Sequence, residues 1–269
     1  MKCYIDKIVT DKDVVTDIKQ LIPDAGLRRR MSKVIKTAVA TAIETISGVE
    51  NIDGLDGIIT ATGWGCLTDS ERFLRNIIVD KEQLLNPTPF IQSTFNTVGG
   101  QIALLRHNHC YNVTFVNRSH SFEDALLDAM MRIEDGESSN LLVGAFDEQT
   151  DSQHKIMERM GIFRSINDGE GSVFVHLKAE ASECSLAQIS AIDFPAHTLS
   201  EQECRTLYLS GDDGELLYNS YREFGLFPTA SAQTLAKAVV KICQGVKEVV
   251  IYNEYFGATP AVVKVQCVG

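Results

Sequence analysis

Residues 112–130 read Asn-Val-Thr-Phe-Val-Asn-Arg-Ser-His-Ser-Phe-Glu-Asp-Ala-Leu-Leu-Asp-Ala-Met. The β-branched and aromatic residues within 112–116 predict a buried strand. The pattern Ser121-x-x-Asp124 is typical of a helix start, and the apolar residues after it recur at helical spacing. The stretch therefore predicts a strand, a tight turn and a helix, with Ser119 in the turn.

Ser119 is the first candidate for a functional residue. A hydroxyl between a strand and a helix N-terminus lies in the positive field of that helix, which suits a nucleophile. His120 is adjacent, but neighbouring side chains rarely point at one another, and the sequence shows no orienting acid. The alternative is that Ser119 is an ordinary turn residue, with Ser121 as the cap of the helix.

The alternation of strands and helices continues along the chain. Apolar runs predict further strands at residues 57–62, 141–146, 172–177, 186–192, 206–209, 248–252 and 261–267. Helical spacing predicts further helices at residues 31–46, 68–78, 97–105, 214–224 and 229–243, with a break at Asn86-Pro-Thr-Pro. This alternation indicates an α/β fold with a largely buried sheet, built from two unequal βαβ-type halves.

The composition is that of a globular protein. The chain has 269 residues, of which 44% are hydrophobic and 23% charged, enough for one large domain or two fused smaller ones. Its formal charge of −11 repels phosphate backbones and argues against a nucleic-acid partner. No apolar run approaches the roughly 18 residues that cross a bilayer. Because the first residues lack a signal-peptide pattern, we expect a cytoplasmic protein with no membrane partner.

The cysteines and the basic residues give weaker evidence about the compartment and the partners of the protein. The seven cysteines are scattered and never spaced as Cys-x-x-Cys, which argues against disulfides and zinc and fits a reducing compartment. The cluster Arg28–Arg30, followed by Lys33 and Lys36, is either a solvated helix start or a contact for an acidic protein or a partner subunit.

Other short motifs favour structural roles. His107-x-His109-Cys110 lacks evident third and fourth ligands, so we expect a polar loop and no metal. Gly63-x-Gly65 and Gly99-Gly100 lack the spacing of a phosphate loop, so we expect tight backbone packing. The adjacent carboxylates Asp147-Glu148 and Asp212-Asp213 predict solvated turns rather than an acid–base couple.

Five blocks of the sequence together resemble a known family. They are Asn86-Pro-Thr-Pro-Phe through Ala103, residues 112–119, Leu141-Leu-Val-Gly-Ala-Phe-Asp-Glu148, Gly169-Glu-Gly-Ser-Val-Phe-Val175 and Asn253-x-x-Phe-Gly-Ala-Thr259. In this order they are similar to segments of the β-ketoacyl synthases, in the thiolase-like superfamily. The resemblance implies a thiolase-like layered α-β-α-β-α fold in shortened form. Residues 1–180 would form its first, nucleophile-bearing half and residues 181–269 its shortened second half, in one compact unit.

The resemblance fails at the catalytic positions. Active synthases carry a cysteine where this chain has Ser119, and they use two histidines in the second half. The corresponding stretches here read Ser210-Gly-Asp-Asp and Gly225-Leu-Phe-Pro-Thr-Ala, and Leu226 stands at or beside the second histidine's position. His197 comes too early to replace either histidine. Decarboxylative condensation needs an imidazole to polarise the thioester carbonyl, and leucine supplies none.

The short form, without a cysteine at the nucleophile position, resembles the chain-length-factor subunits that accompany active synthases in aryl-polyene and polyketide pathways. This implies a catalytically silent subunit without a cofactor, in a heterodimer with an active ketosynthase or in a homodimer, and in only indirect contact with the acyl-carrier protein. Ser119 would occupy the nucleophile position without a confident catalytic role. The residues expected to line the acyl tunnel or the interface are Phe95, Asn96, Gln101, His120, Phe122 and Phe256.

Two other functions fit the same residues. The chain could be an independent acyltransferase or thioesterase that uses Ser119, with a histidine brought close in the fold. It could also be a homodimeric acyl-binding protein without a synthase partner.

Overall fold

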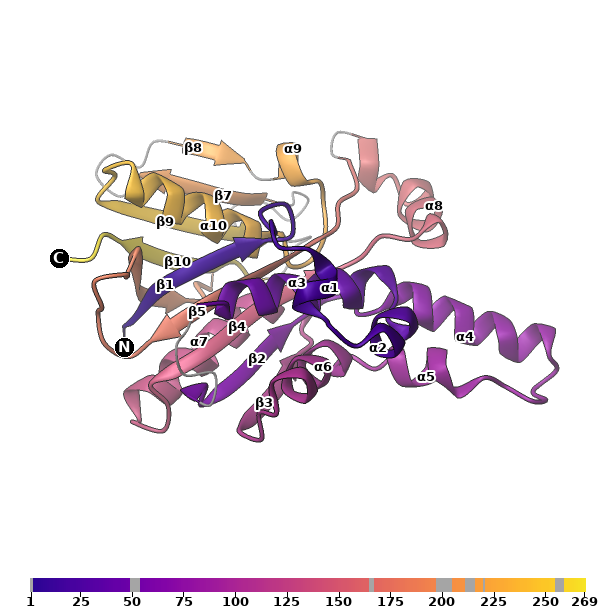
Figure 1. Cartoon of the computed structure of the whole chain (residues 1–269). Helices are drawn as coiled ribbons and strands as arrows, with labels where there is room; N and C mark the ends of the chain where they lie inside the picture. The colour runs from indigo at the N-terminus through magenta and orange to yellow at the C-terminus, as the bar shows by residue number, and fades with distance from the viewer. Residues whose placement is uncertain are drawn as a thin grey trace.

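The computed structural model describes residues 2–48, 54–164, 167–196, 205–210, 216–219, 221–254 and 259–269. Within these ranges ten strands form one sheet (Figure 1). The strands are β1 (Cys3–Thr10), β2 (Gly57–Ala61), β3 (Tyr111–Phe115), β4 (Asn140–Asp147), β5 (Gly171–Lys178), β6 (Ala187–Asp193), β7 (Arg205–Ser210), β8 (Leu216–Asn219), β9 (Glu248–Glu254) and β10 (Ala261–Gln266). The helices are α1 (Ile18–Leu21), α2 (Ala25–Arg30), α3 (Lys33–Ile46), α4 (Leu67–Val79), α5 (Pro87–Gln92), α6 (Thr97–Arg106), α7 (Ser121–Glu134), α8 (Asp151–Arg159), α9 (Tyr221–Phe224) and α10 (Ala230–Cys243).

The strand order repeats within the sheet. The order is β3-β2-β4-β5-β1 and then β6-β10-β9-β7-β8, so the second five strands, counted from their outer edge, follow the same order as the first five. The halves meet where β1 pairs with β6. β2, β3 and β4 are parallel, whereas β7 and β8 form an antiparallel pair. The fold is thus two related five-stranded halves joined edge to edge.

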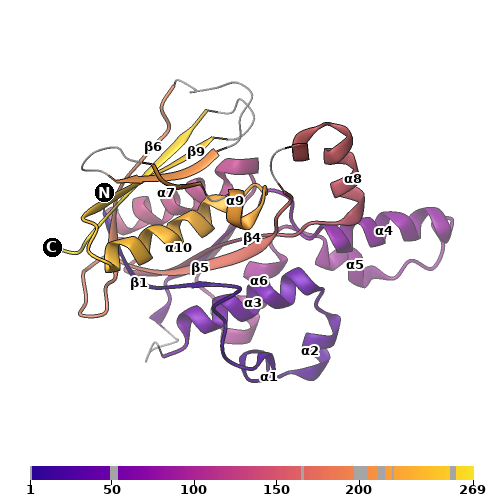
Figure 2. The ribbon, with the colours of Figure 1, turned by 90° about the horizontal axis from the view of Figure 1, so that it is seen from above.

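Helices α7 and α10 lie between the two halves of the sheet (Figure 2). Both contribute to one buried apolar cluster, α7 through Phe122 and Leu126, and α10 through Leu235 and Val239. On the other face of the first half, α3 and α6 form a second cluster. The two halves of the sheet enclose α7 and α10, and Glu123 in the first turn of α7 lies near Ser231 in the first turn of α10.

The outer face of the second half carries polar side chains. Gln188, Glu248 and Gln266 form a hydrogen-bonded row across β6, β10 and β9. An antiparallel sheet can leave one face to solvent, and no helix covers this face among the residues that the structure describes. The connection between β6 and β7 spans only residues 194–204, whereas residues 11–56 connect β1 to β2 and supply α3. Among its described residues, the second half therefore lacks the outer helical layer that α3 supplies to the first half.

Several element boundaries differ from those expected. Pro87 does not break a helix but begins α5, with Asn86 Oδ1 accepting from the Thr88 N–H at 2.9 Å, because proline is tolerated in a first turn. α4 begins at Leu67, one residue before its expected start, and the hydroxyl of Thr68 inside the helix donates to Glu148. The helix expected over 214–224 is wrong: 216–219 form β8, and only 221–224 are helical, with 211–215 and 220 outside the described residues.

The described part of the chain has no helix that combines the length and apolar character needed to cross a bilayer.

Gly63, Gly65 and Gly99 pack tightly, as expected: a Cβ on Gly63 would lie 2.2 Å from Pro228 Cβ. A Cβ on Gly100 would meet no atom within 4 Å, so close packing does not explain why this residue is a glycine.

Candidate functional site

The turn between β3 and α7 is a constrained elbow. Arg118 has a φ of +51°, a left-handed conformation that is uncommon for a residue with a side chain. Ser119 follows it in a single 3₁₀ turn and is 1% exposed. Ser121 is the first residue of α7 and not its cap: its Oγ accepts from the Asn117 N–H at 2.8 Å and donates to the Arg118 carbonyl at 2.7 Å. The hydroxyl thus closes the turn instead of capping the helix.

Asp147, the last residue of β4, is hydrogen-bonded both to the residues that follow β2 and to the residue that precedes α10. Its Oδ1 accepts from Thr62 Oγ1 at 2.8 Å and from the N–H groups of Gly63 and Trp64 at 3.0 and 2.7 Å. Its Oδ2 accepts from the N–H and hydroxyl of Thr229, before α10, at 3.1 and 2.8 Å. Burial raises the pKa of this carboxyl, and the five hydrogen bonds oppose that shift. Asp147 therefore links the ends of β2 and β4 to the start of α10.

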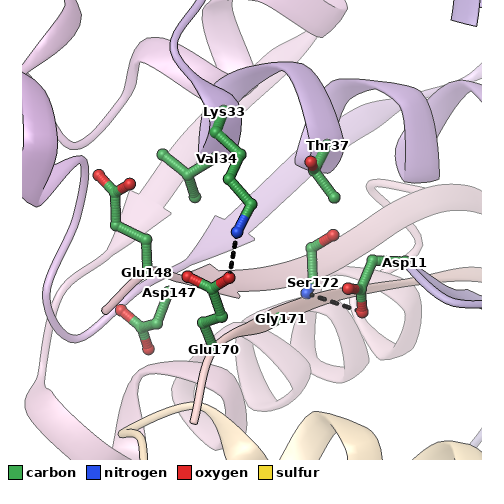
Figure 3. Close-up of a pocket in the computed structure, with 9 residues that line it drawn as sticks. All are labelled: Asp11, Lys33, Val34, Thr37, Asp147, Glu148, Glu170, Gly171 and Ser172. Atoms are coloured by element: carbon green, nitrogen blue, oxygen red, sulfur yellow. Dashed lines mark hydrogen bonds and ion pairs between the residues drawn. The ribbon is translucent and has the colours of Figure 1, made fainter. Parts of the chain in front are cut away.

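The expected solvated turn at Asp147-Glu148 is wrong, because both carboxyls are buried. Glu148 accepts from the N–H and the hydroxyl of Thr68, each at 2.8 Å. Both line a cavity of about 160 Å³ together with Asp11, Lys33 and Glu170, and Lys33 forms an ion pair with Glu170 there (Figure 3). Nothing in the local sequence indicates that Asp147 and Glu148 are buried, because the residues that donate to them lie about 80 positions before or after them in the chain.

The loop before α10 places Leu226 in the interior. Leu226 is fully buried, its N–H donates to the Asn167 carbonyl at 2.8 Å, and its own carbonyl accepts from the Gly169 N–H at 3.2 Å. Gly225 has a φ of +77°, and a Cβ there would lie 2.0 Å from the Asp168 carbonyl oxygen. Backbone bonds and close packing thus fix an aliphatic side chain at this position.

A buried polar network crosses from α7 to β9. Asn253 Nδ2 donates to the Ser119 carbonyl at 3.0 Å and to Glu123 Oε1 at 2.9 Å. Burial raises the pKa of Glu123 to about 7, and the hydrogen bond from Asn253 opposes the shift. Sequence reasoning missed Glu123, although its i, i+3 spacing to Leu126 places it on the apolar face of the helix. The network holds a titratable carboxyl at the N-termini of α7 and α10.

Three of the described histidines contact residues other than Ser119. The His120 ring lies edge-on to Phe194, with centroids 5.5 Å apart. His154 Nδ1 lies 2.9 Å from Asp168 Oδ2, and His176 is bonded to Asn140 within β5 and β4. His197 lies outside the described residues. Among the residues that the structure does describe, no hydrogen bond joins a histidine to Ser119, and no group of three His, Cys, Asp or Glu residues could hold a metal ion.

Residues 10–207 match the family model described as β-ketoacyl synthase, N-terminal domain. The chain belongs to this family. The comparison with curated proteins finds no match.

Solved structures show the same fold at low sequence identity. A chain from a complex of a type II PKS acyl-carrier protein with its ketosynthase (AntDE:AntF) is 11% identical with a TM-score of 0.73, and 99% of each chain is covered. The ishigamide ketosynthase/chain length factor is 15% identical with a TM-score of 0.69, over 95% of this chain and 86% of the other. A ketosynthase (ApeO) complex with its chain length factor (ApeC) from Xenorhabdus doucetiae is 12% identical with a TM-score of 0.61, over 99% of both chains. These likenesses confirm the thiolase-like ketosynthase fold expected from the sequence.

On this ketosynthase fold, the residues expected in a tunnel or interface lie in different surroundings. Asn96 and Gln101 line a cavity of about 330 Å³ between α2, α3, α5 and α6. Phe95 is half-exposed with its ring against Gly65, and Phe122 is buried in the larger core cluster. Ser119 is not among the residues that line this cavity, and Phe256 lies outside the described residues. Their roles stay predictions.

Proposed function

We propose that this chain is a catalytically silent ketosynthase homologue. It pairs with an active ketosynthase and helps to shape the tunnel for the growing acyl chain, in the manner of a chain length factor. The observation that carries the proposal is Leu226, which is fully buried and fixed by its backbone at or beside the place of a catalytic histidine. An aliphatic side chain cannot polarise a thioester carbonyl or support loss of carbon dioxide.

Ser119 supports the same proposal. A nucleophile must be reachable by its substrate, whereas Ser119 is 1% exposed. Activation of a serine also needs a base within hydrogen-bond reach, and none of the described histidines forms such a bond to Ser119. A thioesterase or acyltransferase that uses Ser119 is therefore the second candidate. It rests on the position of that hydroxyl at the start of α7.

The surface supports a protein partner. β3 is an edge strand that pairs only with β2 in the described sheet, and an unpaired edge is a template for another chain. The arm formed by α4 and α5 projects from the body (Figure 1) and exposes large apolar side chains. They are Leu74, Ile78, Val79, Leu84, Phe90 and Ile91. Exposed apolar side chains gathered on one arm are typical of a protein–protein contact.

Solved structures with this fold support a ketosynthase as the partner. Two of the similar structures are a ketosynthase with a chain length factor, and a third contains an acyl-carrier protein with its ketosynthase. A carrier protein that is itself acidic would be repelled by a chain of charge −11, so docking of the carrier would fall mainly to the partner synthase.

Charged substitutions on the arm test the partner contact. We expect Leu74→Glu with Ile78→Glu to abolish co-elution with a co-expressed ketosynthase on size-exclusion chromatography, because burying two carboxylates without partners costs several kcal/mol. Met160→Glu is the matched control: it changes a side chain that is 70% exposed outside the arm and should leave the complex intact. An undiminished complex in the double variant would contradict the arm as the interface. Assembly of the chain only with itself would favour the homodimer.

A further inference from the structure

A cavity of about 330 Å³ lies between α2, α3, α5 and α6, beside the arm formed by α4 and α5. Its volume falls within the usual range for small-molecule pockets, ~300–1,000 Å³. Leu27, Met31 and Ile91 contribute apolar side chains to its walls. Ile91 is also one of the exposed apolar side chains of the arm. The cavity therefore has room for an organic ligand next to the proposed contact with a ketosynthase.

Several polar side chains around the cavity are already hydrogen-bonded within the chain. The hydroxyls of Thr94 and Thr97 each donate to the Ile91 carbonyl at 3.0 Å. The side-chain amide of Gln92 donates to the Arg30 carbonyl. Because these donors are engaged, the walls that they form suit a ligand that needs no hydrogen bonds.

The cavity carries little net charge. Arg30 is the one charged side chain among the described residues that line it, and its Nε donates to the Gly26 carbonyl at 3.3 Å. Asp24, the N-cap of the same helix, opposes this charge: a Cβ on Gly26 would lie 3.2 Å from Asp24 Oδ1 and 3.7 Å from a guanidinium nitrogen of Arg30. The lining therefore suits an uncharged ligand.

Gly100 leaves a gap in the wall that α6 contributes. Asn96, Gly100 and Gln101 all line the cavity, as residues four or five positions apart do when they share one face of a helix. Glycine inside a helix is less stable than alanine, yet a Cβ on Gly100 would meet no atom within 4 Å. Packing within the chain thus does not require a glycine here, and a side chain at this position would take up space in the cavity.

We propose that this cavity binds an uncharged hydrocarbon chain, that of the growing acyl group, and that Gly100 sets the length of chain that fits. The identity of the ligand rests on the proposed pairing with a ketosynthase, which would supply the chain across the neighbouring contact. A hydrocarbon chain carries no charge, needs no hydrogen-bond partner and would bury apolar surface against Leu27 and Met31.

Calorimetric titration of the full chain with 1-butanol, 1-hexanol, 1-octanol and 1-decanol tests the site without a partner. We expect the affinity to rise about fourfold for each added CH₂ group until the cavity is filled, and then to level off. In Gly100→Phe the ring would occupy part of the cavity, so binding of 1-octanol should be ~tenfold or more weaker. Leu104→Phe is the matched control, because Leu104 is an exposed residue of α6 outside the cavity, and this variant should bind like the unaltered chain.

Two results would overturn the proposal. They are no saturable binding of any of the alcohols by the unaltered chain, and equal affinity of the unaltered chain and Gly100→Phe for 1-octanol. The open space at Gly100 makes a folded variant the expected result, which circular dichroism checks. Gly100→Leu, with a smaller side chain, serves the same comparison if the phenylalanine variant does not fold.

Product length in the heterodimer separates this inference from the proposed function. Gly100→Phe should shorten the acyl products while the heterodimer still forms. Unchanged products from an active heterodimer would overturn the acyl-chain site and leave the pairing intact. Absence of a heterodimer, together with the expected alcohol series, would overturn the pairing but not the binding of a hydrocarbon chain.

Discussion

Replacing Asp147 by alanine is expected to lower the free energy of unfolding by about 3–5 kcal/mol, the range for removing one partner of a buried charged network. The change would leave five buried donors from Thr62, Gly63, Trp64 and Thr229 without their acceptor. Urea unfolding at pH 7, followed by circular dichroism, measures the loss.

Asp147→Asn keeps the volume of the side chain but replaces one acceptor oxygen by an NH₂ group. The amide NH₂ would face donors that it cannot satisfy, so this variant should also be destabilised, though less than the alanine variant. Asp135→Asn, at an exposed position after α7, is the matched control and should stay within ~0.5 kcal/mol of the unaltered chain. Equal stability of Asp147→Ala and the unaltered chain would contradict the role of Asp147 as the link between the loops.

Glu123→Gln is expected to stabilise the chain at high pH but not at low pH. Burial raises the pKa of Glu123 from 4.5 to about 7, so the folded state holds the proton more tightly than the unfolded chain. The stability that this supplies is complete below pH 4.5 and is lost as the pH rises through about 7. A shift of this size corresponds to about 3 kcal/mol.

Glutamine keeps the acceptor for Asn253 and removes the titration. The stability difference between Glu123→Gln and the unaltered chain, from urea unfolding, should therefore be small at pH 4.5 and grow to about 3 kcal/mol at pH 8. Glu158→Gln, on the exposed face of α8, should show no such growth. A difference that does not change with pH would mean that Glu123 titrates near its ordinary pKa.

The sequence predicted the elements whose apolar pattern is continuous. β4, β5, α7 and α10 lie within a few residues of their expected positions, because long runs at period 2 or 3.6 leave little choice of structure. The prediction was wrong at Leu216–Asn219, because a short apolar run does not distinguish a strand from a helix. Here the pairing with β7 makes these residues a strand. The boundary at residue 180 stays a prediction.

The site was harder to predict than the fold. The elbow at Ser119 and the aliphatic Leu226 were evident from local pattern and family resemblance. Asp147 and Glu123 were not, because their environments are made by residues far along the chain: Thr62 and Thr229 in one case, Asn253 in the other. Asp147 carries no local sign of its burial, whereas Glu123 has one, its position on the apolar face of its helix.

The measurement that tests the central claim most directly is a condensation assay with malonyl-carrier protein. The chain is co-expressed with a ketosynthase encoded beside it and compared with its Ser119→Ala variant and with each subunit alone. We predict activity only from the heterodimer, unchanged by Ser119→Ala in this chain. Activity from this chain alone, abolished by Ser119→Ala, would contradict catalytic silence and would identify Ser119 as a working nucleophile.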